Sequence, residues 1–261
     1  MRINTLSVVL ATFNEEKNIK DCINSIRRLA DEIVVIDGSS TDKTRDIAEN
    51  LGAKVIKTSN KLMFHKNKQM ALEEAKGEWI LQLDADERLS VELKNEIRSA
   101  INHQPSTIAY YIPRKNYFLG KWLKKGGQYP DYVIRLVKKG KAYFPCKTVH
   151  EQIKVKGKTD YLQNSLIHLA YPNLSSYFRK ANIYTSETAL RWEKEKLPRN
   201  FKTAVKFLVL KPIFTFLNLF LRHKGFFDSW QGFLFALFSA FHFPWAFFKY
   251  LKSNKDHPLQ G

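Results

Sequence analysis

The sequence predicts an α/β protein with a mostly parallel sheet. Over residues 5–90, short apolar runs rich in β-branched residues alternate with segments whose apolar residues recur at helical spacing. Strands that alternate with helices of this length need right-handed crossovers, which place helices on both faces of the sheet. With 261 residues, 44% of them hydrophobic, the chain is long enough to bury a full core.

Four strands can be placed from these patterns. They are expected at residues 6–12 ("LSVVLAT"), 32–37 ("EIVVID"), 53–57 ("AKVIK") and 79–84 ("WILQLD"). A first helix follows the first strand, where the apolar positions at helical spacing are Ile19, Cys22, Ile23, Ile26 and Leu29.

Two more helices are expected between the later strands. The segment 39–52 offers Ser and Thr as N-cap residues and ends on Gly52, as a helix should. The segment 66–76 is predicted to be a helix closed by Gly77.

The positive charge of the chain lies in its second part. Residues 1–100 carry 16 Lys and Arg against 17 Asp and Glu, whereas residues 101–261 carry 27 against 8. A basic surface of this size attracts polyanions such as nucleic acid, anionic lipid headgroups or a phosphorylated substrate.

Two cysteines are too few for a disulfide framework, and residues 1–30 contain no apolar signal segment, so we expect a reduced, cytosolic setting.

Polar residues follow three of the predicted strands. In open α/β sheets, ligands bind outside the carboxyl ends of the strands, so these residues are candidates for a binding site. Each one alone has a structural alternative, because Asp and Asn are common in turns and caps. The residues at these ends are Thr12, Phe13, Asn14 and Glu15 after the first strand, Asp37 after the second, and Asp84 and Asp86 after the fourth.

Asp84 and Asp86 form an Asp-x-Asp pair. On an extended backbone, side chains two positions apart point the same way, so the two carboxylates would converge. Converging like charges favour a cation between them, and oxygen ligands that share the ion with substrate phosphates suit Mg²⁺ or Mn²⁺. The alternative is an acidic turn that leads into a helix over residues 90–102.

Three segments resemble the family 2 inverting glycosyltransferases, which have the A-type nucleotide-sugar-binding fold. They are "SVVLATFNEEKNI", "EIVVIDGSSTDKT" and "HKNKQMALEEAKGEWILQLDADE", in the order typical of the family. The resemblance implies that Asp84 lies near the ribose and diphosphate and that Asp86 ligates the divalent ion, with Asp84 completing the acidic pair. It places in the nucleotide pocket Thr12, Phe13, Asn14, Glu15 and Asp37, with Asp37 facing the base, and it places Lys66 near the phosphates.

Later segments resemble the subgroup that adds sugars, typically β-linked glucose, to the lipopolysaccharide inner core. These segments are "YYIPRKNYFLGKWLKKGGQYPDYVIRLVKKGKAYF" and "VHEQI". The resemblance implies a UDP-linked hexose donor and a lipopolysaccharide, lipooligosaccharide or related glycolipid acceptor. A transferase acting on polyprenyl phosphate is the nearest alternative.

Inversion by direct displacement needs one general base, which takes the proton from the acceptor hydroxyl. We expect this base to be Glu151, with His150 orienting it, contacting the metal or acting as the base itself. Asp131 is the rival carboxylate, for which a turn-capping role is equally expected. Arg135 lies within an apolar strand pattern and is the best candidate to bind the diphosphate or acceptor phosphates through charge-assisted hydrogen bonds.

The last sixty residues are rich in aromatic side chains. Of the 19 Phe, 13 fall within residues 203–251, and residues 229–248 contain no Asp, Glu, Lys or Arg. That stretch is long enough to span a bilayer, but His242 and Pro244 argue against a simple span. The preceding segment mixes apolar residues with Lys and Arg, so we expect interfacial helices on the cytoplasmic face of the inner membrane, against anionic headgroups. A helical cap packed on the protein is the alternative.

The expected division is a nucleotide-sugar-binding half (1–105), an acceptor-binding and catalytic half (106–200) and a membrane-associating segment (201–261).

Two other function classes stay open. A sugar-phosphate nucleotidyltransferase would carry a Gly-rich, basic loop near its N-terminus, which "SVVLATFNEE" lacks. A nucleic-acid-binding protein is suggested by charge alone, but the aromatic residues do not interleave with Lys and Arg, so we expect no nucleic-acid partner.

Overall fold

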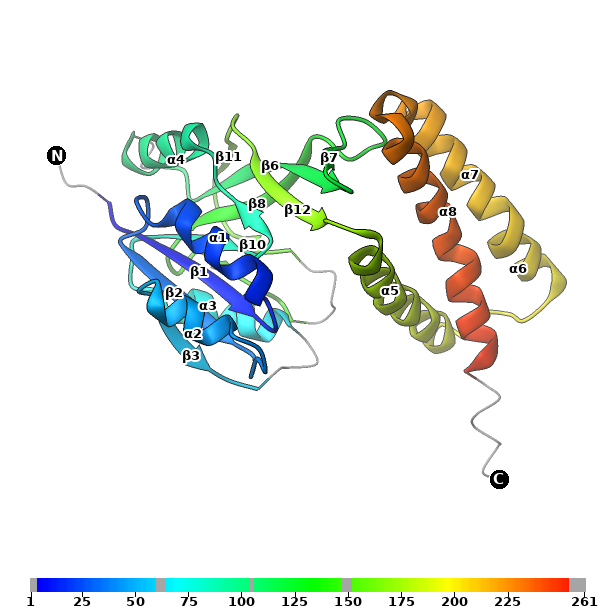
Figure 1. The fold of residues 1–261 in the computed structure, drawn as a ribbon, viewed down its shortest axis with the longest axis horizontal. Coiled ribbons are helices and arrows are strands. Elements are labelled where there is room, and N and C mark those ends of the chain that lie inside the picture. Colours follow the sequence, from blue (N-terminus) through cyan, green and yellow to red (C-terminus); the bar gives the residue numbers. More distant parts are fainter. Residues whose placement is uncertain (1–3, 60–63, 104–105, 147–151, 254–261) are drawn as a thin grey trace. The chain divides into compact units, whose positions relative to one another are not determined.

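The computed structural model describes residues 4–59, 64–103, 106–146 and 152–253 (Figure 1). The chain forms two compact units. Unit 1 comprises residues 1–114 and 131–168, and unit 2 comprises residues 115–130 and 169–261. The predicted half 1–105 therefore lies entirely in unit 1, whereas the predicted segment 106–200 is shared between the units.

A parallel sheet with the order β3-β2-β1-β4 opens unit 1. β1 (Leu6–Thr12) and β2 (Glu32–Asp37) have the predicted bounds, and β3 (Lys54–Lys57) and β4 (Trp79–Leu83) are each one residue shorter than predicted. β1 pairs in parallel with both β2 and β4, and β2 pairs in parallel with β3. The first half of the sheet is therefore the parallel α/β arrangement that the sequence predicted.

Helices cover both faces of this sheet, as Figure 1 shows. They are α1 (Glu16–Ile26), α2 (Thr44–Asn50), α3 (His65–Glu74) and α4 (Val91–His103). Val8 packs in one core with α1, α2 and α4, whereas its neighbour Val9 packs in a second core with α3. This division follows from the strand itself, because successive side chains point to opposite faces.

Gly77 was predicted to end a helix, but the structure shows that it does not. α3 ends at Glu74, and the next residue is extended. The Gly77 N–H donates to Ser7 Oγ at 2.7 Å, and a Cβ at this position would lie 2.6 Å from the Ser7 backbone nitrogen. Glycine is required here because two backbone segments approach closely. Gly52, by contrast, has φ +85° and ends α2 as predicted.

The complete sheet is mixed and not mostly parallel. β8 (Asp131–Lys138) runs antiparallel to β4 and to β6 (Ala109–Phe118), and β12 (Leu166–Tyr171) runs antiparallel to β5 (Glu87–Arg88). No helix lies between β6 and β8, so the chain returns without the crossover that parallel neighbours need. The shorter strands are β7 (Lys121–Trp122), β9 (Ala142–Tyr143), β10 (Lys154–Val155) and β11 (Thr159–Tyr161).

Unit 2 is mainly helical. After α5 (Leu174–Lys194), a continuous helix runs over Phe201–Arg222, and a 3₁₀ turn, η3 (Gly225–Asp228), leads into α8 (Ser229–Lys252). α8 packs against α5 and against the helix Phe201–Arg222 (Figure 1). That helix consists of α6 (Phe201–Val205), the π-helical η1 (Lys206–Leu210), α7 (Lys211–Leu217) and the π-helical η2 (Asn218–Arg222).

Candidate active site

The carboxyl ends of β1, β2 and β4 bring the predicted polar residues to one edge of the sheet. Thr12 and Asp37 are direct partners in the β1–β2 register. Leu10 of β1 is the partner of Leu83, the residue before Asp84. Because these strands are parallel neighbours, the loops that follow them meet at the edge where α/β proteins bind ligands.

Asp37 is fully buried and holds the loop after β2. Its carboxylate accepts hydrogen bonds from the Ser40 N–H at 2.9 Å and the Ser40 hydroxyl at 2.5 Å, and Arg45 Nε lies 3.6 Å from Oδ2. The Thr12 hydroxyl lies 3.4 Å from Oδ1. Both carboxylate oxygens therefore have protein partners, and Asp37 fixes the shape of this loop. Its contact with a nucleotide base stays a prediction.

Hydrogen bonds join the loops that follow β1 and β2. The Asn14 N–H donates to Ser40 Oγ at 2.9 Å, and the Glu15 N–H donates to Thr44 Oγ1 at 2.8 Å. Asn14 has φ +56°, a conformation that Asn tolerates better than most residues. Phe13 is exposed in the same loop. The predicted nucleotide-pocket residues thus belong to one connected wall at the sheet edge.

Asp84 lies between two cations. Lys68 Nζ is 2.5 Å from Oδ1, and Arg135 Nη2 is 2.5 Å from Oδ2. Burial alone would raise the pKa of the Asp84 carboxyl, but Arg135 and Lys68 outweigh it and hold the pKa well below its usual value. Asp84 is therefore ionised at neutral pH. Its predicted places near the ribose and on the metal stay predictions.

Lys68, and not Lys66, supplies the ammonium group beside Asp84. Lys66 is exposed on α3, whereas Lys68 is buried. Residues two positions apart lie on nearly opposite sides of a helix, so one of these lysines faces the sheet while the other faces water. Lys68 precedes the buried residues Ala71 and Leu72 by three and four positions, and this spacing is the sequence signal that identifies it.

Glu87 is the centre of a buried charge network. It is 0% exposed, its Oε1 lies 2.7 Å from Arg135 Nη2 and 3.6 Å from Arg114 Nη1, and its Oε2 accepts the Asp84 N–H at 2.9 Å. Arg114 Nη2 in turn lies 2.7 Å from Asp131 Oδ2. The rival base Asp131 is thus the ion-pair partner of an arginine that the sequence analysis did not single out.

Arg135 is buried, as its apolar strand context predicted, but its contacts lie within the protein. Its guanidinium donates to Gln82 and to the Asp84 and Glu87 carboxylates. A cavity of about 170 Å³ beside it is lined by Arg135, Lys68, Asp84 and Arg114 among others. The lining itself contains three cations and one carboxylate, and Glu87 and Asp131 pair with the two arginines from outside it. N–H donors of Lys68, Arg114 and Arg135 are the kind of group that binds an anion.

The chain turns directly after β4. The Glu87 N–H donates to the Asp84 carbonyl oxygen at 2.9 Å, which closes a turn at Asp84. Because β4 ends at Leu83, the strand-alternation argument for the shared direction of Asp84 and Asp86 is wrong. Their positions depend on this turn.

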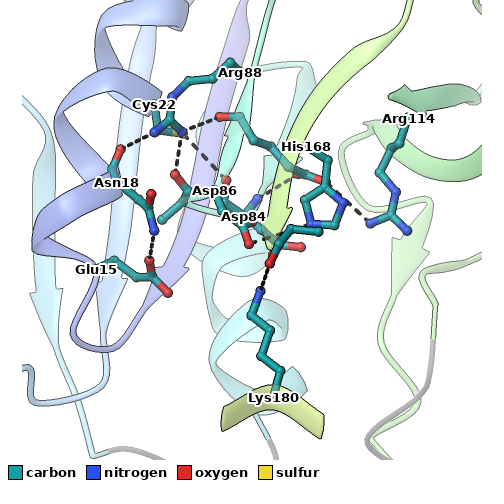
Figure 2. A network of polar contacts seen from close by, with 12 residues as sticks. Glu15, Asn18, Cys22, Asp84, Asp86, Arg88, Arg114, His168 and Lys180 are labelled. Atoms are coloured by element: carbon teal, nitrogen blue, oxygen red, sulfur yellow. Dashed lines mark hydrogen bonds and ion pairs between the residues drawn. The ribbon is translucent and has the colours of Figure 1, made fainter. Parts of the chain in front are cut away.

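Arg88 fastens the turn to α1. Its guanidinium donates to the Ala85 carbonyl oxygen at 2.6 Å and to the Asn18 carbonyl oxygen at 2.8 Å, and Figure 2 shows it joining these two segments. A bidentate guanidinium is a rigid clamp. Arg88 therefore fixes the backbone that carries both aspartates against α1.

Asp86 faces His168 of β12 (Figure 2), with Oδ2 and Nε2 3.7 Å apart. That separation is long for a hydrogen bond, and it exceeds the distance of about 3.0 Å between neighbouring ligands of an octahedral ion that binds each at about 2.1 Å, so the two side chains would move closer to share an ion. Carboxylate suits Mg²⁺ and Mn²⁺, and neutral imidazole is the commonest side-chain metal ligand. The residue types suit a divalent ion, and the role of Asp86 as a metal ligand stays a prediction.

Two protein ligands would leave most of the coordination sphere to phosphate oxygens and water, as Mg²⁺ usually requires. Within the described ranges, no group of three or more His, Cys, Asp or Glu is placed to hold an ion. The predicted base Glu151 and its neighbour His150 lie outside the described residues.

The comparison with protein families decides the class of this chain. The family described as Glycosyl transferase family 2 matches residues 7–183, which include every element of the edge described above. This chain is a family 2 glycosyltransferase. The α/β fold of unit 1 is accordingly the A-type glycosyltransferase fold that the sequence predicted.

Similar glycosyltransferases occur in several bacteria. An uncharacterized glycosyltransferase of Rickettsia typhi is 32% identical over 248 residues, which cover 90% of this chain and 83% of the relative. The lipopolysaccharide core biosynthesis glycosyltransferase LpsC of Rhizobium meliloti is 28% identical over 258 residues, which cover 90% of each chain.

Two solved structures show a more distant likeness. Glucosyl-3-phosphoglycerate synthase from Mycobacterium tuberculosis, in complex with Mn²⁺, UDP and glucosyl-3-phosphoglycerate, is 25% identical with a TM-score of 0.37 and 45% coverage of each chain. TarS of S. aureus is 20% identical with a TM-score of 0.47, over 85% of this chain and 45% of TarS. This glycosyltransferase thus matches less than half of the length of either protein.

Four residues of the glycosyltransferase site escaped the sequence analysis: Lys68, Glu87, Arg114 and His168. Glu87 directly follows the Asp-x-Asp pair, and a third acidic residue there was a usable signal. His168 is the one residue of β12 that ionises near neutral pH, in a strand that is otherwise apolar, and this makes it a candidate for a buried partner, although the sequence does not name that partner. Arg114 stands in a polar run with Lys115 and Asn116 in β6, so the sequence does not single it out.

Proposed function

We propose that this glycosyltransferase transfers a hexose, glucose, from a UDP-linked donor to a hydroxyl of a lipopolysaccharide or lipooligosaccharide core, or a related glycolipid, with inversion at the anomeric carbon. One observation carries the proposal. At the carboxyl edge of the sheet, Asp84 is held by Lys68 and Arg135. Asp86 comes two residues later and faces His168. A nucleotide-diphosphate leaving group needs both a cation and fixed positive charge.

Each part of the edge has a role in this reaction. A divalent ion, when bound by Asp86 and His168, supplies charge that offsets the departing diphosphate. Lys68 and Arg114 place N–H donors in the lining of the adjoining cavity, and Asp84 keeps the Lys68 ammonium oriented. The loops fixed by Asp37 form the wall for the nucleotide.

The acceptor half of the reaction rests on the segment around residue 151. Direct displacement requires a base that takes the proton from the acceptor hydroxyl as the new glycosidic bond forms. We assign this role to Glu151, supported by His150. The likeness to LpsC over 90% of both chains supports the lipopolysaccharide-type acceptor.

We place this glycosyltransferase on the cytoplasmic face of the inner membrane, and the two apolar helices of unit 2 support the membrane association in this proposal. By length and composition, Phe201–Arg222 and Gly225–Lys252 are both apolar enough to cross a bilayer. A glycolipid acceptor is presented at the membrane surface, so attachment would bring enzyme and acceptor together.

A donor screen tests the reaction. Purified protein is incubated with UDP-glucose, other nucleotide sugars and a core-oligosaccharide acceptor, with Mg²⁺, Mn²⁺ or a chelator. UDP-glucose should be turned over with a metal present, and the product should have the inverted anomeric configuration by NMR. Absence of turnover of any UDP-sugar with either metal would contradict the proposal.

Variants assign the roles. Asp86→Asn should lower kcat/KM by at least about a hundredfold, and Glu151→Gln should bind donor normally but transfer slowly. Asp46→Asn, on the exposed side of α2, is the matched control and should resemble wild type. Wild-type transfer by Glu151→Gln would move the base elsewhere.

A further inference from the structure

The surface of the last two long helices is basic and carries no exposed acid in the part that the structure describes. Residues 201–253 contain seven Lys and Arg and one acidic residue, Asp228. Asp228 is buried, and its carboxylate accepts the Lys124 N–H at 3.0 Å and the Lys125 N–H at 2.7 Å. The charge that these helices present to their surroundings is therefore positive throughout.

The same helices expose large apolar side chains. Only 6% of the most apolar stretch of Phe201–Arg222 is buried within the structure. Phe214 is 62% exposed on this helix, and Trp230 is 57% exposed on α8, which packs against it. Soluble proteins seldom expose apolar surface on this scale, so the surface requires a partner. The exposed residues are Phe201, Val209, Leu210, Ile213, Phe214, Leu217, Leu221, Phe226, Phe227, Trp230, Phe233, Leu237, Phe241, Phe248 and Leu251.

Lys211 shows how a membrane would meet the helix Phe201–Arg222. The helix has 22 residues and is about 33 Å long, close to the thickness of the hydrocarbon core. Lys211 is exposed and stands at its midpoint, with Lys206 five residues before it. In a spanning orientation the Lys211 ammonium would lie at the centre of the bilayer, where charge is strongly disfavoured. Along the surface, both lysines reach the headgroups.

α8 is tied to a polar helix on its other side. Lys249 Nζ donates to Asn182 Oδ1 at 2.6 Å, to Thr185 Oγ1 at 2.9 Å and to Ser186 Oγ at 2.8 Å, all on α5. α5 also exposes charged side chains, among them Arg179 and Arg191. Helix α8 cannot be surrounded by lipid along its length unless α5 enters the hydrocarbon with it. This contact therefore opposes a span by α8.

We propose that unit 2 binds the surface of an anionic bilayer, with Phe201–Arg222 and α8 lying in the plane of the membrane and neither helix crossing it. The exposed apolar side chains enter the acyl boundary, and the flanking lysines contact anionic headgroups. α5 stays on the aqueous side of α8. The inference rests on the membrane attachment proposed above and is independent of the transfer reaction.

Vesicle binding tests the partner. The full chain is floated with phosphatidylcholine vesicles that contain or lack phosphatidylglycerol. We expect binding that depends on phosphatidylglycerol and weakens about tenfold or more when Lys202, Lys206 and Lys211 are replaced together by Glu. Replacing the exposed unit 1 residues Lys20, Lys57 and Lys139 by Glu is the charge-matched control and should change little. Circular dichroism checks that both variants are folded.

Three results would overturn the proposed partner. Binding independent of phosphatidylglycerol would remove the anionic lipid, and equal loss in both triple variants would remove the assigned surface. Absence of vesicle binding combined with a concentration-dependent dimer would assign the apolar surface to a second copy of the chain. None of these results bears on sugar transfer, which the donor screen measures separately.

Cysteine labelling tests the orientation. In a Cys146→Ser background, the remaining Cys22 is fully buried and should not react. His223→Cys places a thiol at the turn between the two helices, and Asn95→Cys places one on the exposed surface of unit 1. In sealed membranes, an impermeant maleimide should label both positions from the same side. Labelling of His223→Cys only from the side opposite to Asn95→Cys would show a spanning hairpin and overturn the in-plane orientation, even with vesicle binding intact.

Discussion

Lys68 and Asp84 form an ion pair that joins α3 to the end of β4, with Nζ 2.5 Å from Oδ1. The lysine side chain is mostly buried, so its electrostatic interaction with a nearby charge is stronger than it would be in water. Because Arg135 binds the other carboxylate oxygen, Asp84 stays fixed when a ligand competes for the ammonium. The pair therefore holds a cation ready at the sheet edge where the donor diphosphate is proposed to bind.

Loss of the Lys68 ammonium should weaken donor use. We expect Lys68→Met to lower kcat/KM for the UDP-sugar by about 5–150-fold, equivalent to about 1–3 kcal/mol for one lost charge-assisted hydrogen bond. Steady-state kinetics of Lys68→Met and Lys66→Met, side by side, distinguish the two lysines. A larger effect at the exposed Lys66 would contradict the assignment made from the structure.

Glu87 should contribute to the free energy of unfolding. Glu87→Gln keeps the shape of the side chain but removes the buried anion between Arg135 and Arg114, and breaking a buried pair of this kind costs about 3–5 kcal/mol. Urea unfolding should show this loss. The exposed Glu49→Gln on α2 is the control, with an expected change within about 0.5 kcal/mol. A fall of less than about 1 kcal/mol in Glu87→Gln would mean that water compensates the arginines.

Metal removal should abolish transfer reversibly. A chelator should stop turnover and added Mn²⁺ should restore it, because the charge on the leaving diphosphate is otherwise uncompensated. Asp86→Asn and His168→Gln should each weaken Mn²⁺ binding by at least about tenfold, since each removes one of two protein ligands. Calorimetric titration of Mn²⁺ measures this without activity. Unchanged Mn²⁺ affinity in His168→Gln would leave the imidazole outside the metal site.

Gly77→Ala should destabilise unit 1 by steric overlap. Its Cβ would meet the Ser7 nitrogen at 2.6 Å, and overpacking against backbone costs about 1–3 kcal/mol or more. Gly52→Ala is the comparison, because its Cβ would meet no atom within 4 Å and only the left-handed φ is unfavourable, at about 1–2 kcal/mol. Thermal unfolding of both variants should place Gly77→Ala lower. The reverse order would show that the segment before β4 can move aside.

The parts of this fold that the sequence predicted depend on neighbouring residues. The bounds of β1 and β2 follow from runs of β-branched residues that end at polar ones, and α1 follows from apolar positions that fill one face of a helix. The meeting of Thr12, Asp37 and Asp84 at one edge follows from the crossover rule, because parallel neighbours end on the same side. These relations are local or set by chain topology, so a single sequence contains them.

The sequence by itself determined that this protein is an α/β enzyme of the glycosyltransferase type with an acidic pair after its fourth strand. The tertiary structure alone decided the partners of those acids. Lys68, Arg135 and His168 come from α3, β8 and β12, and their side chains reach the two aspartates through packing of segments far apart in the chain. An ion pair depends on distance in space and on burial, and neither quantity is encoded in the spacing of residues along one segment.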